Sequence, residues 1–298
     1  MTPRPLSAPG RDRSPWLPTS PCTPRGCATT SDGACPVPPV WAAVRLTAGI
    51  LVVLTGVLLA PLTALFAAAA RHALTRLWCG AVLSAFGVRI RVVGTPRGGP
   101  QLVVANHISW LDVPLIAAVL PGRMVAKSEI RHWPLLGPLA ARGGTLFVAR
   151  DRLRSLPGTV RALADALTSG ARVVVFPEGS TWCGRASGRF RPAAFQAALD
   201  AGAPVQPVRI AYLPVGPAAF VGDDPLPASL WRVAAAGGLT AEIRILDPIP
   251  AAPGTDRRSL AWAAQTAVAS DTANRPRSSV HHRASSSPAA ASSARTPS

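Results

Sequence analysis

The sequence is short of charged residues, and above all of acidic ones. Charged residues make up 15% of the 298 positions, whereas a typical soluble domain has about 25%. Lys and Arg number 31 against 14 Asp and Glu, which gives a net charge of +17. Together with a hydrophobic fraction of 48%, this composition excludes a wholly disordered chain and disfavours a fully soluble enzyme.

The sequence also lacks the motifs of nucleic-acid-binding proteins. A basic chain of this kind binds either nucleic acid or an anionic lipid surface. The chain has no zinc-finger spacing and no aromatic RNA-recognition motif, and its basic residues are spread along the body rather than gathered in one arm. We therefore expect a membrane lipid as the partner and no nucleic acid.

Cysteines are too few and too scattered for a disulfide framework. Cys22, Cys27 and Cys35 lie near the start without forming a C-x-x-C pair, and Cys79 and Cys183 are isolated. Cysteines with this distribution are usually reduced thiols with no partner. The sequence therefore predicts neither disulfides nor a metal site.

Composition divides the chain into four parts. Residues 1–40 contain ten prolines and few large apolar side chains, so we expect them to be disordered. Residues 41–87 form an apolar, membrane-anchoring segment, and residues 88–270 carry the mixed pattern of a catalytic domain. Residues 271–298 form a Ser- and Ala-rich tail, which we also expect to be disordered.

The anchoring segment contains a run without any charge. Residues 46–70 are 25 uncharged residues between Arg45 and Arg71, and a helix of about 20 residues crosses a bilayer core. Gly56 and Pro61 interrupt the run, so either a membrane helix or a helical hairpin with a re-entrant path fits the sequence.

The basic residues that follow this run suggest an orientation. Arg71, Arg76, Arg89 and Arg91 cluster after the apolar run, and short cytoplasmic segments next to membrane helices are rich in such residues. We therefore expect a protein of the cell membrane with its catalytic domain on the cytoplasmic face.

The catalytic part predicts an α/β fold with a mostly parallel sheet flanked by helices. Short β-branched or alternating runs alternate with helical segments, which is typical of parallel sheets. The expected strands are 88–93, 101–105, 123–126, 145–148, 172–176, 204–212 and 241–246. The expected helices are 111–120, 134–142, 158–169, 190–201 and 257–270.

The first chemical motif, NHISWLD, follows the strand 101–105. Ligands of parallel sheets bind beyond the carboxyl ends of the strands. A carboxylate at Asp112 accepts the proton of one ring nitrogen of His107 and leaves the other nitrogen as a general base. Asn106, at the start of the motif, is a candidate for substrate binding.

Three further segments carry polar or basic side chains directly after a predicted strand. Glu178, Gly179 and Ser180 follow the strand 172–176 and offer a carboxylate, a flexible backbone and a hydroxyl to a polyol or an anionic headgroup. Arg150 follows the strand 145–148 and suits phosphate recognition, because a guanidinium matches phosphate oxygens. Lys127 is a second candidate for the same anion.

Four segments in order resemble one family. They are NHISWLD (106–112), GTLFVAR (144–150), FPEGS (176–180) and VQPV (205–208), and the pattern is similar to that of the glycerolipid acyltransferases, in particular the 1-acyl-glycerol-3-phosphate (lysophosphatidic acid) acyltransferases. The resemblance implies a membrane-bound enzyme that moves a fatty acyl group from acyl-CoA or acyl-carrier protein to the acceptor hydroxyl, making phosphatidic acid for phospholipid biosynthesis. It implies no cofactor besides that acyl donor.

The resemblance also implies a role for each matching residue. His107 is the general base, and Asp112 orients it. Arg150 holds the acceptor phosphate, and Glu178 and Gly179 bind the glycerol or phosphate portion. Transfer is direct, without an acyl-enzyme.

The sequence leaves the acceptor open. Residues 190–195, FRPAAF, lack the glycine that the family usually shows there, so a lyso-ornithine lipid or a lysophospholipid remains an alternative acceptor. Two different classes of protein also stay open: a membrane-anchored hydrolase with His107, Asp112 and Glu178 around a metal, and a non-enzymatic basic adaptor. The chain has no G-x-S-x-G motif, which disfavours a serine hydrolase of the α/β type.

Overall fold

The computed structural model describes residues 19–29, 35–134, 136–149 and 153–273. In these ranges the strands are β1 Arg89–Val93, β2 Gln101–Ala105, β3 Arg123–Lys127, β4 Leu146–Val148, β5 Arg172–Val175, β6 Val205–Leu213 and β7 Thr240–Ile245. The helices are α1 Pro24–Cys27, α2 Pro39–Leu59, α3 Ala68–Ala85, α4 Asp112–Val119, α5 Leu136–Arg142, α6 Leu156–Thr168, α7 Ala193–Asp200, α8 Leu226–Ala235 and α9 Arg257–Ala273. Three short 3-10 helices are η1 Ala60–Leu65, η2 Ser128–His132 and η3 Leu153–Ser155.

The strands form one sheet, in the order β1-β7-β6-β2-β5-β3-β4. Neighbouring strands run parallel, except that β6 and β7 pair antiparallel. The expectation of a mostly parallel sheet flanked by helices is confirmed. The carboxyl ends of β2, β5, β3 and β4 consequently meet at one edge, where the polar motifs were expected.

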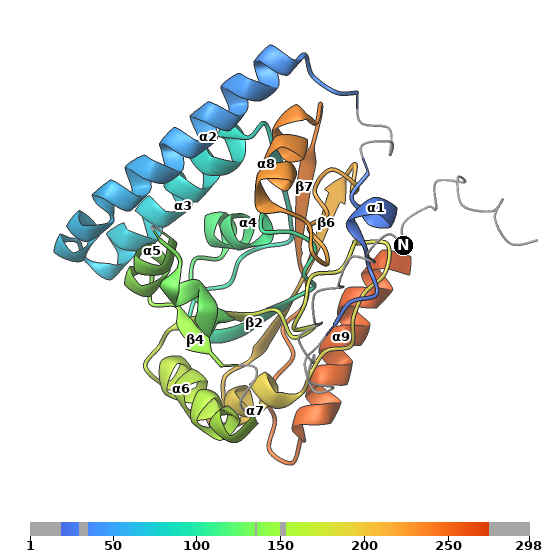
Figure 1. The fold of residues 1–298 in the computed structure, drawn as a ribbon. Helices are drawn as coiled ribbons and strands as arrows, with labels where there is room; N and C mark the ends of the chain where they lie inside the picture. The colour runs from blue at the N-terminus through green and yellow to red at the C-terminus, as the bar shows by residue number, and fades with distance from the viewer. Residues whose placement is uncertain (1–18, 30–34, 135, 150–152, 274–298) are drawn as a thin grey trace, which may run out of the picture.

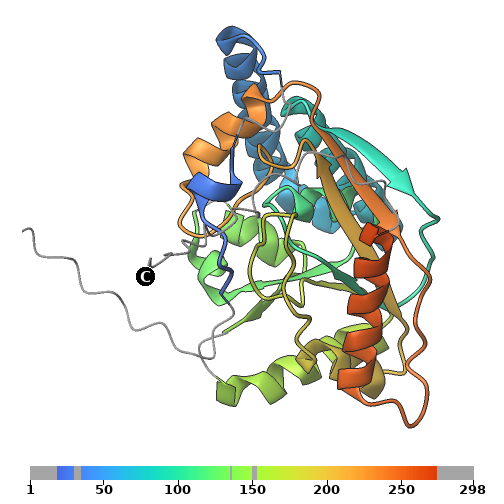
Figure 2. The same ribbon diagram turned by 90° about the vertical axis from the view of Figure 1, so that its right-hand side faces the viewer.

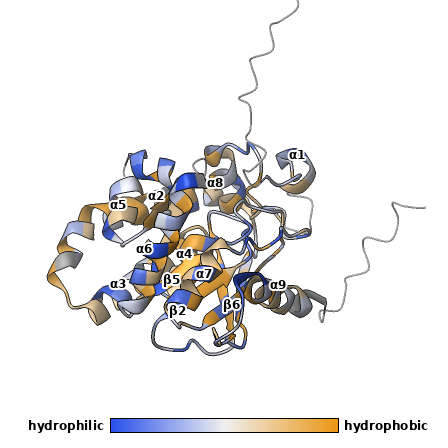
Figure 3. Ribbon diagram, turned by 90° about the horizontal axis from the view of Figure 1, so that it is seen from below, coloured by the Kyte–Doolittle hydropathy of each residue, from blue (hydrophilic) through white to orange (hydrophobic). Residues whose placement is uncertain are grey.

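Helices cover both faces of the sheet (Figure 1), and Figure 2 shows the two layers on opposite sides. β2 lies in the middle and every one of its residues is buried. Val103 and Ala105 face the core cluster under α3, α4 and α8, whereas Leu102 and Val104 face the cluster under α6, α7 and α9. This alternation explains why the strand reads as an unbroken apolar run. Figure 3 shows hydrophobic residues along β5 and α4 at the centre of the molecule.

The anchoring segment is a helical hairpin, one of the two forms that the sequence left open. α2 leads through η1, which contains Pro61, into α3, which packs back along α2. The Trp78 indole N–H donates to the carbonyl of Val52 over 2.9 Å. A Cβ at Gly56 would overlap Trp78, and a Cβ at Gly49 would overlap Phe86. The two glycines therefore let the Trp78 ring, in α3, and the Phe86 ring, directly after α3, lie against α2.

The hairpin exposes an apolar surface. Among the described residues, one helical stretch, Pro39–Thr63, is long and apolar enough to cross a membrane by length and composition, with a mean hydropathy of 2.2. The exposed large apolar side chains of the hairpin include Val40, Trp41, Val44, Ile50, Leu51, Leu54, Leu58, Leu59, Leu62, Leu65 and Phe66. A continuous exposed apolar surface of this extent is typical of contact with a membrane.

Both ends of the hairpin join the same part of the domain. The backbone N–H of Val37 donates to the carbonyl of Ala235, and that of Arg89 donates to the carbonyl of Leu239, each over 2.9 Å. The Arg45 guanidinium donates to the carbonyl of Ala236 over 2.9 Å, at the end of α8. The hairpin therefore leaves the domain and returns to it on one side.

The ends of the chain differ in part from the expectation. We expected residues 1–40 to be disordered, but residues 19–29 and 35–40 are described and contact the domain, with Cys22 buried and Pro36 bridged to Ala236. Composition excluded a core inside this segment, yet the segment packs on a core formed elsewhere. The expected tail begins at residue 271, while α9 continues to Ala273, and residues 274–298 lie outside the described residues.

Candidate active site

His107 and Asp112 form the pair that the sequence predicted. His107 follows the carboxyl end of β2, and Asp112 is the first residue of α4. The His107 Nδ1 atom lies 2.8 Å from Asp112 Oδ2. The geometry suits an Nδ1–H that donates to the carboxylate, which leaves Nε2 with a free lone pair. Within the described ranges, we find no hydrogen bond to Nε2.

The Asp112 carboxylate is fully buried and held by three further donors. The backbone N–H groups of Ile108 and Ser109 donate to Oδ2 over 2.6 and 2.9 Å. The Tyr212 hydroxyl donates to Oδ1 over 2.6 Å. Burial and the nearby carboxylate raise the pKa of Tyr212 well above its ordinary range, so this residue remains a donor. The four hydrogen bonds compensate for burying the charge and fix its position.

The His107 ring is supported on one face and from the backbone. It stacks on Phe176, with 4.1 Å between ring centroids and 15° between planes. Its backbone N–H donates to Glu178 Oε2 over 2.8 Å, and its carbonyl accepts from the backbone N–H of Trp182 over 2.7 Å. The side chain remains 20% exposed, so the fixed imidazole is accessible to a substrate.

Glu178 lies beneath the site. It is 3% exposed, and its second oxygen accepts from the backbone N–H of Gly188 over 2.8 Å. The carboxylate thus joins the segment of His107 to the loop that contains Gly188. The sequence assigned Glu178 to substrate binding, whereas its contacts in the structure are those of a positioning residue.

The pKa of Glu178 makes stability depend on pH. Burial is the main reason that its pKa rises from 4.5 to about 7, while the two N–H donors lower it and Asp112 raises it further. A carboxyl with a raised folded-state pKa contributes stability below its unfolded-state pKa, and this contribution is lost as the pH rises through the folded-state pKa. We therefore predict that the melting temperature of the wild type falls relative to that of Glu178→Gln as the pH rises from about 5 to about 8.

The measurement is a melting curve in detergent at each pH. The matched control is Glu129→Gln on η2, because Glu129 is an exposed glutamate, and its difference from wild type should stay constant. A pH-independent difference between wild type and Glu178→Gln would contradict the raised pKa.

The remaining candidates have different surroundings. The amide of Asn106 donates to the carbonyl of Ile210 and accepts from its N–H, over 3.0 and 2.8 Å, so it joins the end of β2 to β6 instead of facing a substrate. Gly179 has a φ of 77°, which glycine adopts without strain. The hydroxyl of Ser180 is buried, and no hydrogen-bond partner is found for it in the described part of the chain.

Of the two basic candidates, Lys127 and Arg150, the structure describes only the first. Lys127 ends β3, two strands from β2, and is exposed. Arg150 follows β4 and lies outside the described residues. The structure therefore brings His107, Asp112 and Glu178 together, and places Lys127 on the edge that they share.

Four residues around the pair received no role from the sequence: Tyr212, Phe176, Trp182 and Gly188. Tyr212, Phe176 and Trp182 contact the His107–Asp112 pair from distant parts of the chain, and Gly188 contacts Glu178 from the loop that follows it. One available signal was that Tyr212 is the single tyrosine of the chain and lies in a strand whose residues are mostly buried.

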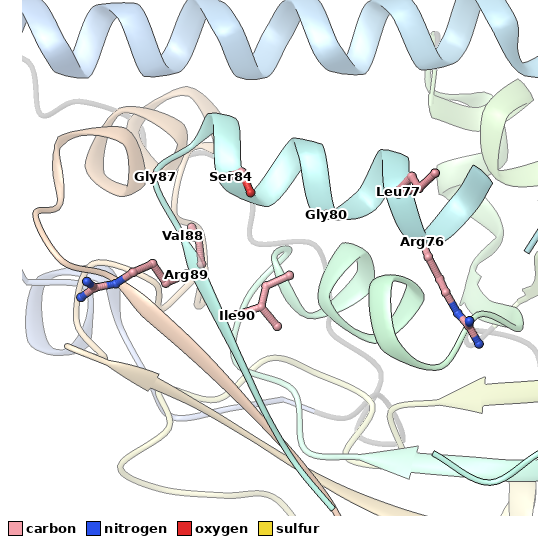
Figure 4. Close-up of a pocket in the computed structure, with 8 residues that line it drawn as sticks. All are labelled: Arg76, Leu77, Gly80, Ser84, Gly87, Val88, Arg89 and Ile90. Atoms are coloured by element: carbon pink, nitrogen blue, oxygen red, sulfur yellow. The ribbon is translucent and has the colours of Figure 1, made fainter. Parts of the chain in front are cut away.

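A hollow lies away from this pair, between α3 and β1. It is lined by Arg76, Leu77, Gly80, Ser84, Gly87, Val88, Arg89 and Ile90 (Figure 4). None of the residues that line it belongs to the site predicted from sequence. Its walls come from the hairpin and from the strand at the edge of the sheet.

Comparisons with known proteins agree with the motifs. A family model described as Acyltransferase matches residues 89–211. A lyso-ornithine lipid O-acyltransferase of Pseudomonas aeruginosa is 41% identical over 202 residues, which cover 66% of this chain and 78% of that protein. A 1-acyl-sn-glycerol-3-phosphate acyltransferase of Neisseria meningitidis is 37% identical over 185 residues, covering 60% of this chain and 72% of that protein.

A solved structure shows the same fold. The 1-acyl-sn-glycerophosphate acyltransferase of Thermotoga maritima aligns with a TM-score of 0.62 at 17% identity, over 80% of this chain and 98% of that one. At that identity the likeness concerns the fold alone. With the sequence matches, the four motifs in order and the paired His107 and Asp112, the chain belongs to the glycerolipid acyltransferase family and is an acyltransferase.

Proposed function

We propose that this enzyme transfers a fatty acyl group from acyl-CoA or acyl-carrier protein to the free hydroxyl of 1-acyl-glycerol-3-phosphate, and so makes phosphatidic acid. The observation that carries the proposal is the partly exposed His107 ring, whose Nδ1 bonds to the buried Asp112. Acyl transfer to an alcohol requires a base at the hydroxyl, and this pair provides one.

In the proposed reaction, His107 Nε2 takes the proton of the acceptor hydroxyl while the oxygen attacks the thioester carbonyl. The imidazolium that forms is stabilised by the negative charge of Asp112. When the tetrahedral intermediate collapses, the C–S bond breaks and the leaving thiolate receives the proton from the imidazolium. The enzyme returns to its initial state, and no covalent acyl-enzyme is required.

The other chemistry suggested by the sequence receives less support. A hydrolase would need His107, Asp112 and Glu178 as metal ligands. Each carboxylate oxygen of Asp112 and Glu178 accepts at least one hydrogen bond from the protein, an arrangement that suits positioning groups. The occupied oxygens favour acyl transfer by a general base.

A second candidate acceptor is a lyso-ornithine lipid. The Pseudomonas aeruginosa relative named for that acceptor is 41% identical, compared with 37% for the Neisseria meningitidis relative named for the glycerol phosphate. In the proposed reaction Arg150 holds the acceptor phosphate, and Gly179 and Ser180 lie near the glycerol. Lyso-ornithine lipid has no phosphate, so a test of acceptors separates the two.

We place the catalytic domain on the cytoplasmic face of the cell membrane. The hairpin leaves and rejoins the domain on one side, which keeps the domain on one face of the bilayer. Arg45, Arg71, Arg76 and Arg89 lie along or beside the hairpin, and basic residues in such positions are typical of the cytoplasmic side.

The test is acyl transfer by membranes that contain the protein. Labelled oleoyl-CoA and, separately, oleoyl-acyl-carrier protein are supplied with lysophosphatidic acid, lyso-ornithine lipid or lysophosphatidylcholine, and membranes without the protein give the background. We expect labelled phosphatidic acid. Product from lyso-ornithine lipid alone would reassign the acceptor, and no product from any pair would contradict the proposed function.

A further inference from the structure

Three cysteines from distant parts of the chain meet beside the active site. Cys22 and Cys27 belong to the N-terminal segment around α1, and Cys183 belongs to the loop that follows β5. Their Sγ atoms all lie within 4.8 Å of one another. Cys22 and Cys183 are buried and Cys27 is half-buried. The cysteines are free thiols, as the sequence led us to expect, but the sequence did not reveal that three of them lie together.

The surroundings suit a thiolate cluster. The Cys22 and Cys27 thiols hydrogen-bond to the Cys183 sulfur, as do the backbone N–H groups of Arg185 and Ala186. Two thiols and two backbone N–H groups therefore converge on the Cys183 sulfur, an arrangement that favours negative charge on this atom.

The walls of the cluster are apolar. Cys22 and Cys183 pack with Ala219 and Val221, and Cys27 and Trp182 lie against them. Thiolate ligands in a mostly buried position are typical of structural Zn²⁺ sites. A tetrahedral zinc with Zn–S bonds of about 2.3 Å separates its sulfurs by about 3.8 Å, which three sulfurs within 4.8 Å reach with small side-chain rotations.

We propose that Cys22, Cys27 and Cys183 form a Zn²⁺ site with three thiolate ligands. The fourth tetrahedral position takes a water molecule or another exogenous ligand. Binding forms three Zn–S bonds, and each thiol that ligates the metal releases its proton to solvent. A disulfide would join two of these sulfurs and leave the third without a partner, so the mutual proximity of all three favours the metal.

The metal would join the N-terminal segment to the active-site loop. Cys183 follows Trp182, whose N–H donates to the His107 carbonyl, and the same loop leads to Gly188, whose N–H donates to Glu178. Fixing Cys183 therefore restrains the loop that bonds to His107 directly, through Trp182, and indirectly, through Gly188 and Glu178. The zinc acts on structure at this site, because its ligands do not include a catalytic group.

The first test is the zinc content of the full-length protein, purified in detergent with a non-chelating reductant and measured by mass spectrometry. We expect equimolar zinc in the wild type and in the control Cys35→Ser, since Cys35 is exposed and outside the cluster. Cys183→Ser should lose the zinc. Equal zinc in Cys183→Ser would overturn the proposal, as would none in the wild type.

A second test needs no variant and so does not depend on folding of a mutant. Alkylation of each cysteine is followed by peptide mass spectrometry with and without added Zn²⁺. We expect Zn²⁺ to slow modification of Cys22, Cys27 and Cys183 but not of Cys35, and a chelator to reverse this. Equal rates with and without Zn²⁺, or a disulfide between Cys183 and either partner in unoxidised protein, would overturn the proposal.

Discussion

A His107→Gln variant is expected to lose acyl transfer by about 10²–10⁴-fold in kcat/KM, the range that a positioned general base contributes. The imidazole is stacked on Phe176 and bonded through Nδ1 to Asp112, so its Nε2 is held where a hydroxyl can reach it. Glutamine fills a similar volume, but its side-chain amide has no comparable basicity at neutral pH.

This variant should fold, because the hydrogen bonds that position the segment come from the backbone of His107. Its N–H donates to Glu178 and its carbonyl accepts from Trp182, and glutamine keeps both groups. The matched control is His132→Gln, since His132 is exposed on η2. Acyl transfer rates and melting temperatures are compared, and an unchanged rate in a folded His107→Gln protein would refute the role of base.

The strands and the catalytic pair were predictable because their signals are local. β5 reads as a run of valines, and β2 as an apolar run with both faces buried. His107 and Asp112 are five positions apart, so a turn into α4 is sufficient to bring them together. The long apolar segment of the hairpin was also predictable from its composition. Pro61 indicated a break in it, but not that α3 packs back along α2.

Contacts between segments that are far apart in the sequence could not be predicted from local patterns. The Tyr212 hydroxyl reaches Asp112 only because β6 lies beside β2. Glu178 was assigned to a substrate because it follows a strand and matches the family motif, but β5 also lies beside β2 and brings its carboxylate to the backbone of His107. Helix α8, whose bounds are Leu226–Ala235, was not predicted. Its residues, several Ala and Leu with a Pro in the first turn, are compatible with a helix, so this helix was missed and not hidden by its composition.

An Asp112→Asn variant is expected to show the second large loss of activity. The hydrogen-bond donors around this residue determine how the asparagine side chain is oriented. Two backbone N–H groups, of Ile108 and Ser109, point at Oδ2, so the amide oxygen must occupy that position. The amide NH₂ then faces the Tyr212 hydroxyl, which can accept a hydrogen bond by rotating. His107 therefore keeps its acceptor and its tautomer, and what is lost is the negative charge.

The size of the loss follows from that charge. At an effective dielectric constant of about 20, a carboxylate about 5–6 Å from the centre of an imidazolium stabilises it by about 3 kcal/mol, which corresponds to about 10²-fold in rate. The loss should fall on kcat and leave the KM of the acceptor unchanged, because Asp112 is fully buried and does not touch the substrate. A merely structural role would instead lower the melting temperature or change both constants.

Tyr212→Phe is the matched control for Asp112→Asn, since it removes one hydrogen bond to Asp112 and keeps the charge and the other three donors. Its kcat should fall far less than that of Asp112→Asn. Equal losses in the two variants would show that the position of the carboxylate matters more than its charge. A loss confined to Asp112→Asn, with an unchanged KM, would locate the effect in the imidazolium formed when His107 takes the hydroxyl proton.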